Sequence, residues 1–339
     1  MKRALEGAGR IVVLTHDNPD PDAIASAAGL AFLLEKLTGQ AITLAFGGII
    51  GRSENRALME ELGRPFERIE NLELTPSTAV VLVDTQPRAG NNSLPAGHIA
   101  TVVLDHHPWR PESAAAPFSD VRPEYGACSS MVVELLRAAK LEPERRLATA
   151  LFYGIQSETM DLGREASEAE VDASLYLYPR SDPGSISRIR HARVPRGLYR
   201  TIHDGLERAW SQGGVVCVPA GRLDYPDIVA QLADLFLRAH GVEWVIAAGR
   251  YGQDLYISLR TFEPGAHAGE LVLSVVGDRG SAGGHGEMAG ARIPIGARPE
   301  EEVDGLVDSL FDAFCRVLEV EELPREPLIP LPSSGSGEA

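Results

Sequence analysis

Short apolar runs that lead directly into polar residues recur through the first half of the chain. They occupy residues 11–14, 79–83 and 101–104. Residues 23–37 are rich in Ala and Leu, lack Pro and stop near Gly39, which predicts a helix. Strand-like runs that alternate with helix-like segments are typical of a mostly parallel sheet flanked by helices. The first half is therefore predicted to be an α/β domain.

The second half of the chain shows a similar alternation on a smaller scale. Residues 215–219, 244–248 and 255–260 are predicted to be strands. Residues 228–240 and 303–318 are predicted to be helices. Together they predict a second, smaller α/β domain.

Turn-forming residues separate the two halves. The sequence Arg-Ser-Asp-Pro-Gly interrupts the pattern at 180–184, and a helical stretch from about 198 to 210 follows it. Residues 324–339 contain Pro, Ser and Gly throughout, which predicts a disordered tail. The predicted organisation is therefore a first domain over residues 1–182, a helical linker over 183–210, a second domain over 211–323, and the tail.

The composition narrows the class of protein. A formal net charge of −16 argues against a protein that coats long nucleic acid, although bound divalent cations would still allow a small anionic substrate. Three widely spaced Cys residues fit a reducing compartment and offer no Cys-based zinc site. No apolar run approaches the roughly 18 residues needed to cross a bilayer. These features predict a cytoplasmic protein that has no membrane partner.

Residues of metal-ligand type follow each of the three apolar runs. In an open α/β sheet, the carboxyl ends of the strands lie at one edge, so we expect these side chains to share a metal site. Taken singly, an Asp after a strand is more typical of a helix cap or a turn, but the joint pattern favours the metal site. The residues are His16, Asp20, Asp22, Asp84, Asp105, His106 and His107.

The mixture of carboxylates and imidazoles favours Mn²⁺, with Mg²⁺ and Co²⁺ as alternatives. Asp84 would bridge two ions about 3.5–4 Å apart, the separation used for in-line phosphoryl displacement. His106 would complete the second ion's site. Asp105 or His107 would then either orient a metal ligand by a hydrogen bond or contact the substrate.

The sequence around these positions resembles the DHH phosphoesterase superfamily. Residues 15–23, Thr-His-Asp-Asn-Pro-Asp-Pro-Asp-Ala, are similar to its first motif, and residues 81–85, Val-Leu-Val-Asp-Thr, to its second. Residues 104–108, Leu-Asp-His-His-Pro, are similar to the sequence that names the family. Residues 283–290 resemble the glycine-rich sequence of the DHHA1 domain, with Met288 in place of an alanine. The resemblance is greatest to the nanoRNase and pAp-phosphatase branch, and it extends to about residue 323.

This resemblance implies an N-terminal DHH domain and a smaller C-terminal DHHA1 domain across a cleft. It implies two metal ions that share one carboxylate, and a His107 that contacts the scissile phosphate. The implied ligands of the first ion are His16, Asp20 and Asp84. Those of the second are Asp22, Asp84, His106 and an acid of a fourth motif. The implied substrate-binding residues of the second domain are Arg260, Gly283, Gly284 and His285.

The fourth motif is where this chain departs from the family. The family has Thr-Asp-Thr or Ser-Asp-Thr, whereas this chain has Ser157-Glu158-Thr159. Glu158 is one methylene longer than aspartate. We expect this difference to affect metal affinity and catalytic rate but not the fold. We predict that Glu158 is the ligand and keep Asp161 as the alternative.

The glycine-rich residues 283–290 have two interpretations. Composition alone favours a flexible loop. The family resemblance favours a backbone cradle, in which glycines allow N–H groups to approach a phosphate.

The leading hypothesis is a Mn²⁺-dependent phosphodiesterase or phosphatase. It would hydrolyse short oligoribonucleotides or small nucleotides such as pApA and pAp by a two-metal mechanism. The expected partners are these substrates and not a long duplex, and the resemblance implies a homodimer. One alternative is an exopolyphosphatase or pyrophosphatase. Another is a catalytically weakened nucleotide-binding module, which the Glu158 departure keeps open.

Overall fold

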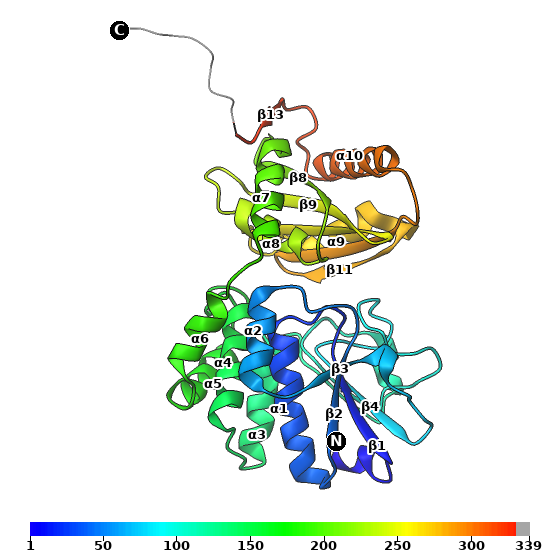
Figure 1. Cartoon of the computed structure of the whole chain (residues 1–339), viewed down its shortest axis with the longest axis vertical. Coiled ribbons are helices and arrows are strands. Elements are labelled where there is room, and N and C mark those ends of the chain that lie inside the picture. The colour runs from blue at the N-terminus through cyan, green and yellow to red at the C-terminus, as the bar shows by residue number, and fades with distance from the viewer. Residues whose placement is uncertain (330–339) are drawn as a thin grey trace. The chain divides into compact units, whose positions relative to one another are not determined.

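The structure is a computed structural model that describes residues 1–329, with the side chain of His285 left out. The chain divides into two compact units, Met1–Arg193 and Val194–Ala339 (Figure 1). The helical stretch expected near residues 198–210 is α7 (Arg196–Arg208), which belongs to unit 2.

Unit 1 contains a sheet of six parallel strands in the order β3-β2-β1-β4-β5-β6. Its strands are β1 (Arg10–Leu14), β2 (Ile42–Phe46), β3 (Phe66–Arg68), β4 (Thr78–Val83), β5 (Val102–Asp105) and β6 (Phe118–Val121). Its α-helices are α1 (Pro21–Thr38), α2 (Ser53–Leu62), α3 (Cys128–Ala138), α4 (Arg145–Glu158), α5 (Glu168–Leu177) and α6 (Pro183–Arg190). Its 3₁₀ helices are η1 (Lys2–Leu5), η2 (Ile69–Asn71), η3 (Pro111–Ala115) and η4 (Tyr178–Arg180).

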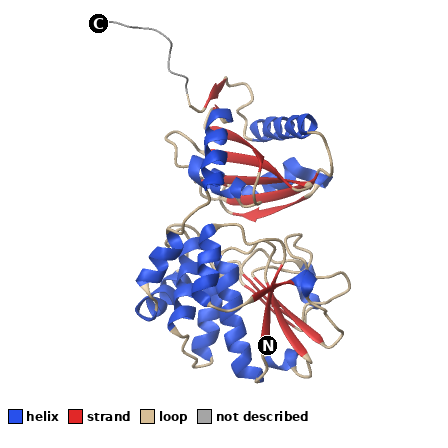
Figure 2. Ribbon diagram, in the orientation of Figure 1, coloured by secondary structure: helices blue, strands red, loops and turns tan. Residues whose placement is uncertain are grey.

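The two faces of this sheet are covered differently. Ile11 and Val13 of β1 belong to a core that they share with residues of α1, α3 and α4, and these helices stack beside the sheet (Figure 2). Val12 and Leu14 belong to a separate core, which includes Ile69 of η2. Burial on both faces explains why the strands read as continuous apolar runs.

Unit 2 contains a mixed sheet of seven strands in the order β11-β12-β10-β9-β8-β7-β13. Only the β8–β9 pair is parallel among the pairs described. The strands are β7 (Trp210–Gln212), β8 (Val215–Arg222), β9 (Trp244–Tyr251), β10 (Asp254–Thr261), β11 (Ser281–His285), β12 (Met288–Pro294) and β13 (Arg325–Pro327). Besides α7, the helices are α8 (Ile228–Phe236), α9 (Ala268–Val276), η5 (Gly277–Arg279) and α10 (Glu300–Val317). The predicted α/β fold class is confirmed for both units.

Two segments differ from their predicted form. The tail predicted over residues 324–339 contains strand β13, which pairs antiparallel with β7, and residues 330–339 lie outside the described part of the chain. The glycine-rich segment begins as strand β11 instead of a loop. A Cβ atom on Gly284 would lie 2.2 Å from the carbonyl oxygen of Met288, and one on Gly269 of α9 would lie 2.3 Å from that of Gly284. Both glycines therefore permit close packing of backbone on backbone.

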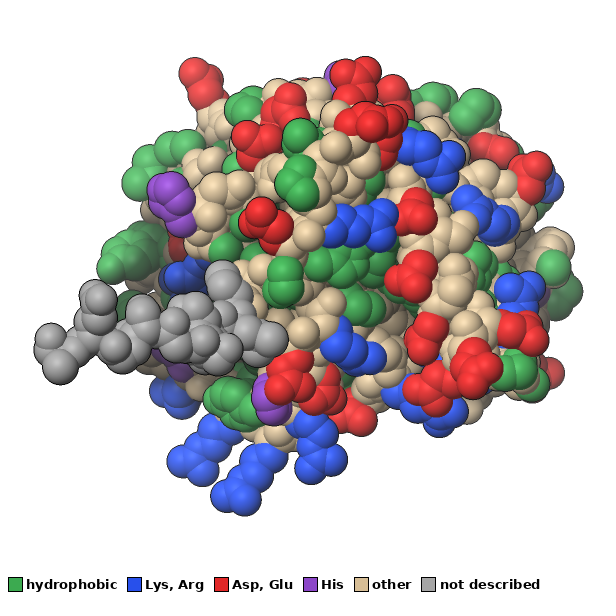
Figure 3. Space-filling view, turned by 90° about the horizontal axis from the view of Figure 1, so that it is seen from above, with side chains coloured by type: hydrophobic (Ala, Val, Ile, Leu, Met, Phe, Trp, Pro, Cys, Tyr) green, Lys and Arg blue, Asp and Glu red, His purple; other side chains and the backbone are tan. Residues whose placement is uncertain are grey.

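Acidic and basic side chains are interspersed over the face drawn in Figure 3. No helix among residues 1–329 is long and apolar enough to cross a membrane.

Candidate metal centre

Three strands bring the predicted metal residues to one edge of the unit 1 sheet. β1, β4 and β5 are neighbours in the strand order. Asp84 follows the last residue of β4 directly, and β5 ends at Asp105, which His106 and His107 follow. Because the strands are parallel, their carboxyl ends lie at the same edge.

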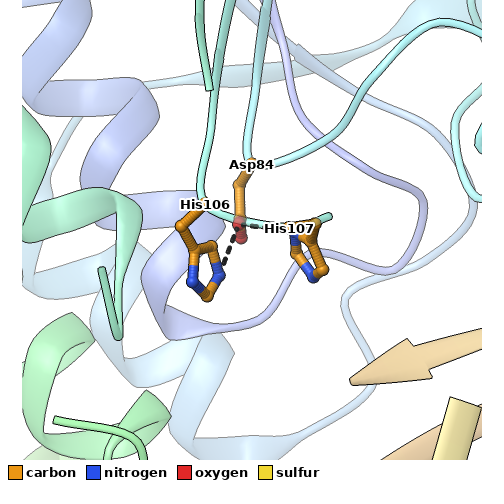
Figure 4. Close-up of side chains that lie close together, drawn as sticks. All are labelled: Asp84, His106 and His107. Atoms are coloured by element: carbon orange, nitrogen blue, oxygen red, sulfur yellow. Dashed lines mark ion pairs between the residues drawn. The ribbon is translucent and has the colours of Figure 1, made fainter. Parts of the chain in front are cut away.

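Asp84 lies at the centre of this group and is 2% exposed. Its Oδ1 lies 3.3 Å from Nε2 of His106 and 3.7 Å from Nδ1 of His107, as Figure 4 shows. Its Oδ2 lies 3.7 Å from Nε2 of His16. The Asp84 backbone is left-handed, with φ 58°, a conformation that aspartate tolerates better than most residues and that is enriched at functional sites.

Two of the imidazoles are oriented by backbone carbonyl groups. Nδ1 of His16 lies 2.9 Å from the carbonyl oxygen of Asp17, and Nδ1 of His106 lies 3.1 Å from that of Tyr125. Since a carbonyl oxygen can only accept, each Nδ1 carries the proton and donates. Both rings therefore direct Nε2 toward Asp84, the orientation that metal-binding histidines adopt.

Asp20 acts as a helix cap and also faces the site. Its Oδ1 accepts a hydrogen bond from the backbone N–H of Ala23 at the start of α1, and its Oδ2 lies 3.5 Å from Nε2 of His16. Burial lowers the pKa of His16, but the carboxylates of Asp20 and Asp84 outweigh it and raise that pKa to about 10. Without a cation, His16 therefore holds a proton within the carboxylate cluster.

Asp22 joins the site to a second helix. Its two carboxylate oxygens accept hydrogen bonds from the backbone N–H groups of Cys128 (2.7 Å) and Ser129 (2.8 Å) at the start of α3. Burial, together with the negative charges of Asp84 and Glu158, raises the pKa of Asp22 well above its usual value. A divalent cation would reverse this effect, because it replaces repulsion between carboxylates with attraction.

His107 is held by a chain of buried side chains. Its Nδ1 donates to Oδ1 of Asp105 at 2.8 Å, and the Gln86 side-chain amide donates to Oδ2 of Asp105 at 2.6 Å. Burial raises the pKa of Asp105, but the charge and hydrogen bond of His107 outweigh it and lower that pKa to about 2. Asp105 is therefore an ionised carboxylate that fixes the His107 ring.

The structure separates the two acids proposed for the fourth motif. Glu158 is the last residue of α4, and its negative charge raises the pKa of both Asp22 and His106. Asp161 is exposed and pairs with Arg190 at 2.6 Å. Glu158 therefore interacts electrostatically with the candidate site, unlike Asp161, which pairs with Arg190. Glu158 belongs to none of the tight groups of ligand atoms found among the described residues.

Within the described residues, three groups of ligand atoms each lie within 4.8 Å of one another, and all three contain Asp84. No hydrogen bond from a described residue reaches Oδ1 of Asp84, although this atom is buried. A buried, negatively charged oxygen of this kind, surrounded by imidazole and carboxylate donors, fits a divalent cation. The groups are Asp84, His106 and His107; His16, Asp20 and Asp84; and Asp22, Asp84 and Cys128.

Two residues of this region were not identified from the sequence. Gln86 follows the Asp84-Thr85 pair directly, and its position next to a candidate ligand was the only sign of it in the sequence. Cys128 gave no sign, because its position depends on α3 meeting the end of β5. Burial, then the charges of Asp84 and Asp105, raises the pKa of Cys128, so it is a neutral thiol.

The predicted substrate residues of unit 2 lie on two strands. Arg260 of β10 is occupied, since its Nε donates to Oδ1 of Asp234 at 2.8 Å and its Nη1 donates to backbone carbonyl groups. Gly283, Gly284 and His285 belong to β11, which pairs with β12. Substrate binding by these residues remains a prediction.

Residues 10–155, which include every candidate ligand except Glu158 and Asp161, match the N-terminal domain of the DHH family. They form a DHH-family domain. The predicted DHH resemblance is therefore confirmed, while the nanoRNase branch remains a prediction.

Relatives extend the similarity beyond the DHH domain. An uncharacterized protein of Methanocaldococcus jannaschii is 32% identical over 322 residues, which are 93% of this chain and 65% of that protein. A probable manganese-dependent inorganic pyrophosphatase of Lactiplantibacillus plantarum is 24% identical over 164 residues, which are 48% of this chain and 52% of that protein. The chain thus spans less than two thirds of the length of either relative.

Among solved structures, an exopolyphosphatase-related protein of Bacteroides fragilis has a TM-score of 0.68 and 14% identity. The match covers 94% of this chain and 96% of that one. At this identity the likeness shows a shared fold, which extends through both units.

Proposed function

We propose that the chain is a divalent-metal-dependent hydrolase of phosphate esters. The observation that carries the proposal is the convergence of His16, His106 and His107 on the buried carboxylate of Asp84 at the carboxyl edge of a DHH-domain sheet. The pyrophosphatase relative is described as manganese-dependent, which favours Mn²⁺. Bound cations would supply Lewis-acid stabilisation of the charge on the phosphate oxygens.

The proposed roles follow from the donors that each group presents. His16, Asp20 and Asp84 would hold one cation, because their ligand atoms lie within 4.8 Å of one another. The proposed holders of a second cation are Asp22, Asp84, His106 and Glu158.

His107 is proposed to act on the substrate. Its Nδ1 already donates to Asp105, so Nε2 is the ring atom proposed to donate to a phosphate oxygen. Burial lowers the pKa of His107, but the carboxylate of Asp105 outweighs it and raises that pKa. A protonated imidazole in this position stabilises negative charge on the phosphate and can supply a proton to a leaving oxygen.

We propose a small nucleotide as the substrate, of the pAp, pApA or short-RNA type. The net charge of −16 opposes binding of long polyanions. The similarity to the M. jannaschii relative covers 93% of this chain and therefore includes the second α/β unit. A second unit favours a substrate that offers a further group to bind besides the phosphate. Cytoplasmic location and a homodimer are parts of the same proposal.

Anhydride hydrolysis is the second candidate, because the relatives with described activities are a pyrophosphatase and an exopolyphosphatase-related protein. The pyrophosphatase similarity is limited to 164 residues, so it does not extend to the whole chain. A weakened nucleotide-binding module is less favoured, since the charge of Glu158 reaches both Asp22 and His106.

One assay separates these candidates. Purified protein with Mn²⁺ is given pAp, pApA, a short RNA, pyrophosphate or polyphosphate, and the products are quantified. We expect turnover of the nucleotides. Turnover of pyrophosphate or polyphosphate alone would assign the anhydride activity, and nucleotide binding without any turnover would assign the binding module.

A further inference from the structure

Trp109 is an exposed aromatic residue beside the candidate catalytic histidine. Trp109 is 50% exposed, and it lies two residues after His107. Since consecutive Cα atoms are about 3.8 Å apart, the two Cα atoms lie within about 8 Å of each other. The backbone of Trp109 is therefore within reach of a ligand whose phosphate contacts His107.

The backbone on both sides of Trp109 is anchored. Gln86, which is 1% exposed, donates to the carbonyl oxygen of Pro108 at 3.0 Å and accepts from the backbone N–H of Arg110 at 2.8 Å. A fixed backbone limits the loop's freedom to bury the indole elsewhere. A large apolar residue thus remains exposed, although its burial would be favourable.

Two arginines lie close to Trp109 or Gln86 in sequence: Arg110 directly follows Trp109, and Arg88 lies two residues after Gln86. No described side chain pairs with the guanidinium group of Arg110, which is half-buried, or with that of Arg88, which is exposed. Arg110 lies three residues after His107, and Arg88 lies four after Asp84. In a chain of net charge −16, unpaired cationic side chains on the segments that follow Asp84 and His107 fit an anionic ligand.

We propose that Trp109 is a stacking platform for the nucleobase of the substrate, with Arg110 beside it for a phosphate. An aromatic face stacks on any base and adds affinity without reading sequence. This inference rests on the proposed function in one respect, namely that the substrate carries a base. Pyrophosphate and polyphosphate have no base that could stack on Trp109.

The test compares two ligands that differ only by the base. AMP and ribose 5-phosphate are titrated by calorimetry, with Mn²⁺, into the full chain and into Trp109→Ala, Trp109→Leu and Trp109→Phe. We expect wild type to prefer AMP. Ala and Leu should lower AMP affinity about 5- to 150-fold and leave ribose 5-phosphate affinity within about twofold, while Phe should retain most of the preference. Tyr178→Ala, which removes another exposed aromatic of unit 1, is the matched control and should change neither affinity.

Four results would overturn the inference. In wild type they are equal affinity for the two ligands and the absence of AMP binding. In the variants they are an equal loss of both affinities in Trp109→Ala and full AMP affinity in Trp109→Leu, which has no ring. Failure of the proposed function looks different. Base-dependent binding without nucleotide turnover would reject the hydrolase and keep the platform, whereas nucleotide turnover without base preference would reject the platform alone.

Discussion

Replacing Gln86 with Leu should weaken both the fold of unit 1 and its activity. The side chain is 1% exposed and makes hydrogen bonds to Asp105 and Pro108 as a donor, and to Arg110 and Ser113 as an acceptor. Leu has a similar size and no polar atoms. The substitution therefore removes these bonds without leaving a large cavity.

The magnitude follows from the groups that lose a partner. A buried polar group left unsatisfied costs about 1–3 kcal/mol. An oxygen of the Asp105 carboxylate, the N–H of Arg110 and the hydroxyl of Ser113 are all affected. Because the hydroxyl can rotate, two groups are counted, and the free energy of unfolding should fall by about 2–6 kcal/mol. Since Asp105 orients His107, kcat should also fall about 10- to 100-fold.

Urea denaturation followed by circular dichroism measures the first effect, and steady-state hydrolysis of the preferred substrate measures the second. Gln156→Leu is a matched control in unit 1, because the buried Oε1 of Gln156 accepts no hydrogen bond from a described residue. We expect that variant to lie within about 1 kcal/mol of wild type. A Gln86→Leu variant as stable and active as Gln156→Leu would refute the reasoning.

Three further predictions concern the candidate cation site. Asp84→Ala should abolish turnover while circular dichroism stays that of the wild type, and an active variant would exclude the site. In metal-free protein, the folded pKa of His16 (about 10) exceeds the unfolded value of 6.5, so its contribution to stability is present below pH 6.5 and lost towards pH 10. Thermal melts in EDTA should show this loss of stability, and the His16→Gln variant should not show it. Mn²⁺ affinity should rise over the same pH range, because the ion then has no proton on His16 to displace. Calorimetry should show weaker Mn²⁺ binding for Glu158→Ala but not for Asp161→Asn, and the opposite order would assign the ligand to Asp161.

The residues at the sheet edge could be predicted because short stretches of sequence are enough to show them. Asp84 and Asp105 each stand at the end of an apolar run, and parallel strands bring such ends together without further information. The same reasoning anticipated that an Asp after a strand often caps a helix. Asp20 does so for α1 while it also faces His16, so the two interpretations were not exclusive.

The remaining features depend on contacts between distant segments. Asp22 caps α3 across 106 positions of sequence, and no local pattern encodes such a partner. The place of Gln86 depends on where the segment after β5 folds back. The glycines of β11 read as a loop because their packing against α9 and β12 is visible only in three dimensions.

Asp20 and Asp22 each belong to the candidate cation site and also accept hydrogen bonds at the start of a helix. Each carboxylate is fixed by backbone N–H groups at the start of a helix, so its position is set when the chain folds. A cation that arrives later finds these oxygens already immobilised and has little ordering left to impose. We therefore expect the ion to be loaded and lost without rearrangement of the starts of α1 and α3.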